Sequence, residues 1–194
     1  MNYLAHSYLN ETEEQLVGQF LNDYIRNRDR HLLPEGIQDG IRRHRAIDSF
    51  TDTHPAIIEA KKVFAPLTRL YAGAFVDVAM DYFLANDPKI LSTTEWKAHS
   101  QATYATLRNY LYLFPENFKT VLHYMEKDDW LYNYRTDWGM KHSLQNVLNK
   151  AKYLDKSLPI FDAFLKEKPF LQSCYDAFFP ELRATVVVLD FKPY

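Results

Sequence analysis

The chain has little cysteine, little glycine and no long apolar run, and each shortage excludes a class of protein. Cys174 is the only cysteine, so no disulfide framework or cysteine zinc site is expected, and a reducing, cytoplasmic environment is predicted. Only five residues are glycine, which favours helices over turn-rich folds. No apolar stretch approaches the roughly 20 residues that span a bilayer, and no basic segment precedes an apolar run at the N-terminus. The sequence therefore predicts a soluble, unprocessed protein.

The charges of the chain are nearly balanced, with 23 basic and 25 acidic residues. A formal charge of -2 argues against a general nucleic-acid or membrane binder. A length of 194 residues, of which 47% are apolar, suits one sizeable domain, and no linker or repeat divides it. Apolar residues spaced mostly three or four apart predict an all-α fold. We therefore expect a single helical domain over residues 1–194.

Capping residues and prolines predict where several helices begin and end. Two pairs have the spacing of capping boxes, two prolines suit the first turn of a helix, and a third is expected to open a helix. These residues are Thr12 with Gln15, Ser92 with Glu95, and Pro34, Pro55 and Pro115. Further helices are expected over 122–134, 142–153 and 159–179, with Pro180 ending the last one. The β-branched segment 185–189 has no partner strand, so a tail or short helix is expected there.

The most informative stretch places one imidazole and two carboxylates at successive four-residue steps. His44, Asp48 and Asp52 share one helix face, and the same stripe continues backwards to Ile41 and Ile37. These polar groups therefore extend a face that points to the core. A buried carboxylate needs a cation or hydrogen-bond donors, and a divalent metal suits several carboxylates beside a His.

Two other segments also direct carboxylates inward. Asp77 and Asp81 lie four apart in an apolar helical run, and Asp23 follows Leu16 and Phe20 along one helical stripe. Each acid alone is also explained by a structural salt bridge or a helix cap. A shared site is the better account of all of them together.

A group of arginines interrupts the otherwise balanced charge pattern. Only three acids oppose it within the same window. The arginines are Arg26, Arg28, Arg30, Arg42, Arg43 and Arg45. Such a window suits an acidic partner, and a solvated helix surface is the alternative.

Several short motifs occur in the same order as in one protein family. They are Met1-Asn-Tyr-Leu-Ala-His6, the segment 18–23, His44-Arg45-x-Ile47-Asp48 with Thr51-Asp52, Asp77-x-x-x-Asp81-x-Phe83-Leu84, Tyr124-Met, Trp130-Leu131-x-x-Tyr134-Arg135 and Gln145-Asn-Val-Leu148. By these residues, which cover most of the chain up to about 150, the sequence resembles the acyl-carrier-protein phosphodiesterases. Each motif alone is weak, but the ordered set is specific.

The resemblance implies a metal-dependent hydrolase with an HD-like helical bundle, related to the HD-type phosphohydrolases. Such an enzyme removes the 4′-phosphopantetheine arm from holo acyl carrier protein and leaves the apo protein. The implied cofactor is a divalent metal, Mn²⁺ or else Mg²⁺, that activates water for attack on phosphorus. Acyl carrier proteins are acidic, which would give the basic window a binding role in fatty acid metabolism. The arginines expected to contact the carrier protein are Arg26, Arg28, Arg30, Arg42 and Arg43.

The resemblance and the residue pattern together suggest a role for each polar group. As metal ligands we expect Asp23, His44, Asp48 and Asp81, and as catalytic residues His6, Arg45, Asp52 and Asp77. Arg45 would hold the phosphate oxygens. Asp52 and Asp77 would orient a ligand or act as general base. A lone His such as His6 is more often a core or surface residue than a ligand.

Two positions depart from the family pattern, because Tyr8 and Tyr82 stand where related sequences can carry a His. A neutral phenol seldom binds Mn²⁺ or Mg²⁺. If those His residues are ligands in the relatives, this protein would hold fewer metals, use another substrate or be inactive.

Two other functions stay open on the sequence. One is an HD-like phosphohydrolase that acts on a nucleotide or another small phosphodiester. The other is a non-catalytic protein that binds the carrier protein, for which we would expect binding without turnover.

Overall fold

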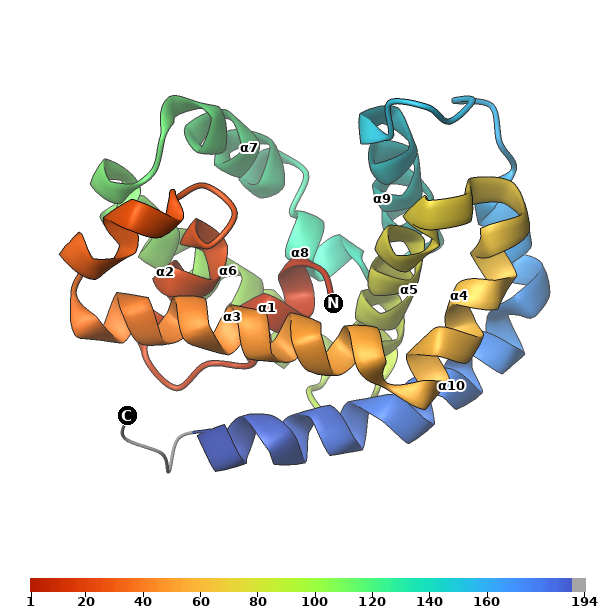
Figure 1. Ribbon diagram of the computed structural model, residues 1–194, viewed down its shortest axis with the longest axis horizontal. Coiled ribbons are helices and arrows are strands. Elements are labelled where there is room, and N and C mark those ends of the chain that lie inside the picture. The colour runs from red at the N-terminus through yellow and green to blue at the C-terminus, as the bar shows by residue number, and fades with distance from the viewer. Residues whose placement is uncertain (190–194) are drawn as a thin grey trace.

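A computed structural model describes residues 1–189, and the described part is all-α without any strand (Figure 1). The prediction of an all-α fold is confirmed. The helices are α1 (Tyr3–Tyr8), α2 (Glu13–Leu21), α3 (Glu35–Thr53), α4 (Pro55–Thr68), α5 (Ala72–Asn86), α6 (Thr93–Asn109), α7 (Glu116–Lys127), α8 (Trp130–Asn133), α9 (Asp137–Lys150) and α10 (Ile160–Leu189). Short 3-10 helices are η1 (Asn27–Leu32), η2 (Arg69–Tyr71) and η3 (Leu111–Leu113).

The predicted helix starts are confirmed at both capping boxes. The Thr12 side chain accepts from the backbone N–H of Gln15 and begins α2, and Ser92 does the same with Glu95 at α6. Pro55 is the first residue of α4. Pro34 is the N-cap residue of α3, one position before the predicted first turn. Pro115, which we expected to open a helix, is the N-cap residue of α7.

Several predicted helix boundaries were wrong. The expected start at 122 lies inside α7, and the expected end at 153 lies beyond the end of α9 at Lys150. The helix expected over 122–134 is divided after Lys127, because Asp129 has a left-handed backbone with φ of 44° and separates α7 from α8. The helix expected from 142 begins at Asp137, where the side chain of Thr136 caps it. Pro180 does not end α10, which runs on to Leu189 and so includes the segment 185–189.

The continuation of α10 past Pro180 has a packing explanation. Pro180 itself is exposed, whereas Phe178, Phe179 and Leu182 around it are fully buried. A proline inside a helix loses one hydrogen bond and costs about 3 kcal/mol. Burial of each large apolar side chain returns about 1.5–3 kcal/mol, so the packed helix is favoured over a break.

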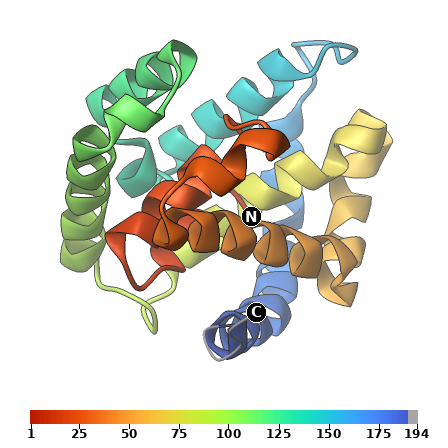
Figure 2. The same ribbon diagram turned by 60° about the vertical axis from the view of Figure 1, so that its left-hand side comes forward.

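Helix α10 lies along α3, α4 and α5 and forms one side of the molecule (Figures 1 and 2). The segment Pro55–Asn86 is long and apolar enough for a membrane span by composition, contrary to our sequence-based expectation. In the structure this segment turns at Arg69, and α4 and α5 pack against each other. The apolar side chains of α5, such as Phe75 and Met80, form the protein core.

The most extensive helix contact joins α2 and α3. A glycine in each helix allows the close approach: a Cβ on Gly18 would lie 2.1 Å from the carbonyl oxygen of Ile37, and one on Gly40 would lie 2.1 Å from that of Gln15. Because α2 ends just before Asp23 and α3 carries His44, this contact determines how the predicted site residues face one another.

We expect Gly40→Ala to lower the free energy of unfolding by about 1–3 kcal/mol, because the added methyl group forces the two helices apart. Urea denaturation measures the change. Gly73→Ala is the control, since its Cβ would meet only the flexible end of Lys61 at 3.3 Å, and it should be neutral or slightly stabilising. Equal stability of the two variants would contradict the tight packing of α2 on α3.

The N-terminal segment lies near the middle of the molecule. In Figure 1, α3 passes below it, and α7 and α9 stand on opposite sides above it. Figure 2 also places the N-terminus among α2, α3 and α5. This arrangement brings α1 next to the predicted site residues of α3 and α5.

Candidate active site

A cleft of about 830 Å³ is lined by residues from both halves of the chain. The first half contributes acids and imidazoles from α1, α3 and α5 and the ends of α2. The second half contributes mainly aromatic and uncharged polar groups from α7, α8 and α9, among them Tyr124, Trp130, Tyr134 and Asn146. A cleft of this size holds a small-molecule ligand or a substrate arm.

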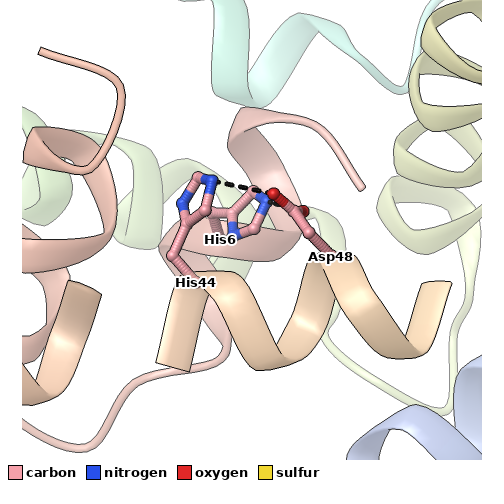
Figure 3. A group of neighbouring side chains, drawn as sticks. All are labelled: His6, His44 and Asp48. Carbon is pink, nitrogen blue, oxygen red and sulfur yellow. Dashed lines mark ion pairs between the residues drawn. The ribbon is translucent and has the colours of Figure 1, made fainter. Parts of the chain in front are cut away.

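Inside the cleft, one carboxylate contacts two stacked imidazoles from the side (Figure 3). Asp48 Oδ1 is 3.3 Å from His6 Nε2, and Asp48 Oδ2 is 3.1 Å from His44 Nε2. The two rings are stacked, with centroids 3.9 Å apart and planes 9° from parallel. The three side chains offer ligand atoms that lie within 4.8 Å of one another, so they are able to hold a metal ion.

The charges of this cluster are set by burial and by the neighbouring groups. Burial alone raises the pKa of the Asp48 carboxyl, but the hydrogen bond from the His44 imidazole holds it well below its usual range. Burial lowers the pKa of His6, and the adjacent His44 ring lowers it further against the opposing effect of Asp48. The cluster is therefore an anionic carboxylate beside a neutral His6 near pH 7, which suits a cation.

Three more of the predicted acids line the same cleft. Asp23 Oδ1 is 3.8 Å from His44 Nε2 and is the acid nearest to the cluster after Asp48. Asp77 Oδ1 is 3.0 Å from the amino group of Met1, and burial raises the pKa of Asp77. Asp52 lies at the rim, 72% exposed at its side chain, with Oδ1 2.8 Å from Lys61 Nζ.

Asp81, which we expected to be a metal ligand, is not among the residues that line the cleft. Its carboxylate is fully buried and accepts three backbone N–H groups at the start of α1, from Leu4 at 2.7 Å and from Asn2 and Ala5 at 3.3 Å. Both oxygens thus bind the start of α1. The geometry makes Asp81 the anchor of α1, the helix that carries His6.

The predicted phosphate clamp is also separate from the cluster. Arg45 is exposed and donates from a terminal nitrogen to Asn27 Oδ1 at 2.7 Å, and it is not among the residues that line the cleft. Within the basic window, Arg26 and Arg28 are exposed, and Arg42 pairs with Glu35 and Asp39.

Two arginines of the window are not on the open surface. Arg43 is only 4% exposed and does not belong to the exposed patch, because it lies on the buried side of α3. Arg30 is half-buried and donates to Asn22 Oδ1 at 3.2 Å.

Tyr8 and Tyr82, which we expected to depart from the family pattern, do not line the cleft. Tyr8 packs against Trp96 and His99. Tyr82 packs against Phe164 and accepts a hydrogen bond from Lys168 Nζ at 2.5 Å. Neither side chain is placed to coordinate a metal at the cluster of His6, His44 and Asp48.

Gln19, Tyr134 and Asn146 were not identified as site residues from the sequence. Gln19 Oε1 lies 2.7 Å from His6 Nδ1, and Tyr134 and Asn146 line the cleft. The available signal was the resemblance itself, because the segment 18–23 and the motifs around 130–135 and 145–148 all include these positions. Their spacing alone predicts only helix surfaces.

An all-α fold with an aspartate bonded to two stacked imidazoles, inside a cleft, defines a class of helical proteins with a candidate metal centre. The sequence model of the acyl carrier protein phosphodiesterase family matches residues 1–182. The chain belongs to this family.

Curated relatives agree over most of the chain. An acyl carrier protein phosphodiesterase of Enterobacter sp. (strain 638) is 30% identical over 185 residues, which are 94% of this chain and 95% of the relative. One of Escherichia coli (strain K12 / DH10B) is 31% identical over 196 aligned positions, or 95% and 96% of the two chains. One of Photorhabdus laumondii is 31% identical over 136 residues, or 69% of each. No solved structure matches the chain significantly.

Proposed function

We propose that this protein is a metal-dependent phosphodiesterase that releases 4′-phosphopantetheine from holo acyl carrier protein. The observation that carries the proposal is the Asp48 carboxylate held between His6 Nε2 and His44 Nε2 inside the cleft. Family membership supports the choice of substrate. The cleft volume is within the range of about 300–1,000 Å³ that holds small ligands, so the arm would fit there.

The donor set fits a divalent metal. His6, His44 and Asp48 would hold the ion, with Asp23 close enough to complete the site from the open side. Two imidazole nitrogens favour Mn²⁺ over Mg²⁺, because Mg²⁺ prefers oxygen ligands. When bound, the ion supplies an activated water and neutralises charge on the phosphoryl group.

The remaining acids of the cleft would position water and substrate. Asp77 borders the cluster from α5 and is our candidate for accepting a proton from the attacking water. Asp52, at the rim, is held by Lys61 and would orient groups at the entrance. We assign Asp81 to the support of α1 and not to coordination, because three N–H groups occupy its oxygens.

The exposed arginines near the cleft would bind the acidic carrier protein. Arg26 and Arg28 flank the start of η1, only a few residues after Asp23, and both are exposed. Complementary charge steers two proteins together and fixes their orientation. We also propose a cytoplasmic location, which the single cysteine supports.

Intact-mass spectrometry tests the proposed reaction directly. Holo acyl carrier protein incubated with this protein and Mn²⁺ should lose the mass of one 4′-phosphopantetheine, and a chelator should prevent the loss. Complex formation without any mass change would instead indicate a binding protein. Cleavage that continues in the presence of the chelator would contradict the metal dependence.

Charge reversal tests the docking surface. We expect the double variant Arg26→Glu/Arg28→Glu to lower kcat/KM for the carrier protein about tenfold or more at low salt, because encounter with an acidic partner depends on these charges. Activity on a small chromogenic phosphodiester should stay unchanged.

The matched control for this variant is Lys62→Glu/Lys166→Glu, which makes the same change of charge at exposed sites on α4 and α10. An equal loss in both double variants would indicate an effect of net charge. An equal loss on both substrates would count against the carrier-protein surface.

A further inference from the structure

We infer that the side-chain amides of Asn10 and Gln19 fix the tautomer of His6, so that its Nε2 lone pair is presented to a metal ion beside Asp48. The inference rests on the metal role proposed above for His6. It assigns Gln19 and Asn10 as positioning residues that act through His6 and do not touch the substrate.

The first step of the argument is the orientation of Asn10. Its Nδ2 donates to the backbone carbonyls of His6, at 2.6 Å, and Ser7, at 3.1 Å. A carbonyl oxygen only accepts hydrogen bonds, so the amide nitrogen must face these two groups. Oδ1 of Asn10 therefore points the other way, towards Gln19.

The second step is the orientation of Gln19, which is only 1% exposed. Its Nε2 donates to the backbone carbonyl of Leu9 at 3.0 Å and to Asn10 Oδ1 at 2.7 Å. Both partners are acceptors, and together they use both N–H groups of the amide. Oε1 of Gln19 is thereby left to face His6 Nδ1 at 2.7 Å.

The third step concerns the ring of His6. Because Gln19 Oε1 only accepts, the hydrogen bond requires a proton on His6 Nδ1. A neutral imidazole with its proton on Nδ1 carries its lone pair on Nε2, and this atom lies 3.3 Å from Asp48 Oδ1. Two acceptors at this separation repel each other, and a metal ion bound by both removes the repulsion. A hydrogen-bond partner on the far nitrogen is how metal-binding imidazoles are commonly oriented.

His44 differs in this respect and provides an internal comparison. Its Nδ1 is buried and has no hydrogen-bond partner among the described residues. No acceptor therefore fixes its proton on Nδ1, and its Nε2–H is able to donate to Asp48 Oδ2 at 3.1 Å when no metal is bound. The structure thus prepares His6 for coordination in advance, whereas His44 must move a proton to coordinate through Nε2.

The tautomer is measurable in the metal-free protein by long-range ¹H–¹⁵N NMR of labelled histidine at about pH 8, assigned with a His6→Gln variant. We expect His6 to be in the Nδ1–H form. In Gln19→Leu this preference should be lost, and the affinity for Mn²⁺, measured by calorimetry, should fall 10- to 100-fold.

Gln15→Leu is the matched control, because Gln15 is also a buried amide of α2, but its side chain donates to Asp39 and accepts from the backbone N–H groups of Glu11 and Thr12 at the start of its own helix. It should cost stability without changing the His6 tautomer or Mn²⁺ affinity. An Nε2–H or mixed form of His6 in the unsubstituted protein would overturn the inference even if Gln19→Leu does not fold. An unchanged Mn²⁺ affinity in a folded Gln19→Leu would also overturn it.

These outcomes are separate from those of the phosphodiesterase assay. A fixed Nδ1–H tautomer with Mn²⁺ binding, but no release of 4′-phosphopantetheine, would leave the inference standing and reject the proposed substrate. Release of 4′-phosphopantetheine with a mixed His6 tautomer would reject the inference and support the proposed substrate.

Discussion

Asp48→Asn should abolish Mn²⁺ binding at the cluster and lower the release of 4′-phosphopantetheine by at least about 10³-fold. The amide has nearly the same shape as the carboxylate but no charge, and its nitrogen would face one of the two imidazoles. Metal activation of water and phosphate is worth several kcal/mol, and about 4 kcal/mol corresponds to 10³ in rate. Calorimetry with Mn²⁺ and the intact-mass assay measure the two losses.

Asp176→Asn is the control for this variant, because Asp176 is an exposed acid on α10 that accepts a hydrogen bond from Gln172 and does not line the cleft. It should bind Mn²⁺ and turn over at the unsubstituted rate. Full turnover of Asp48→Asn would show that the metal binds somewhere other than the cluster of His6, His44 and Asp48. Retained Mn²⁺ affinity with lost turnover would make Asp48 a catalytic group and not a ligand.

The pairing of His44 with Asp48 could be predicted from the sequence because both residues lie on one helix face. Spacing of four residues places their side chains together whatever the rest of the fold does. The capping boxes at Thr12 and Ser92 are local in the same sense, and the structure contains both.

The contact of His6 with Asp48 could not be predicted in the same way. Its partners are Gln19 on α2 and Asp48 on α3, which come close only after the helices pack. No helical spacing links these three positions. The ordered motifs shared with the family were the available signal, and they mark a position without giving its contacts.

For Asp81, the sequence predicted burial but not the groups that compensate it. The apolar pattern around it correctly indicated a buried carboxylate, and the need for compensating groups was also correct. Pattern alone does not tell a metal from hydrogen-bond donors. The donors are backbone N–H groups of α1, which are 76 to 79 positions away in sequence and have no signature in side-chain spacing.

Among the variants proposed here, replacement of the Asp81 carboxylate should lower the free energy of unfolding the most. In Asp81→Ala, three N–H groups at the start of α1 lose their acceptor in a site that is closed to water, and each such loss costs about 1–3 kcal/mol. We expect the free energy of unfolding to fall by about 3–5 kcal/mol, a large share of the roughly 5–15 kcal/mol of a typical domain. Urea denaturation measures it, with Asp176→Ala as the exposed control. A change below about 1 kcal/mol would contradict the anchoring role.

The pH dependence of the same comparison gives a second check. Burial raises the pKa of Asp81 to about 7, although the amino terminus and the N–H groups of Leu4, Asn2 and Ala5 oppose the rise. In the unfolded chain the group ionises near pH 4, so between about pH 4 and pH 7 the folded state binds the proton more tightly. The stability contributed by Asp81 is therefore fully present below pH 4 and is lost as the pH rises through 7. The difference in unfolding free energy between the unsubstituted protein and Asp81→Ala should be larger at pH 5 than at pH 8, and an equal difference at the two pH values would show that Asp81 is already ionised at pH 5.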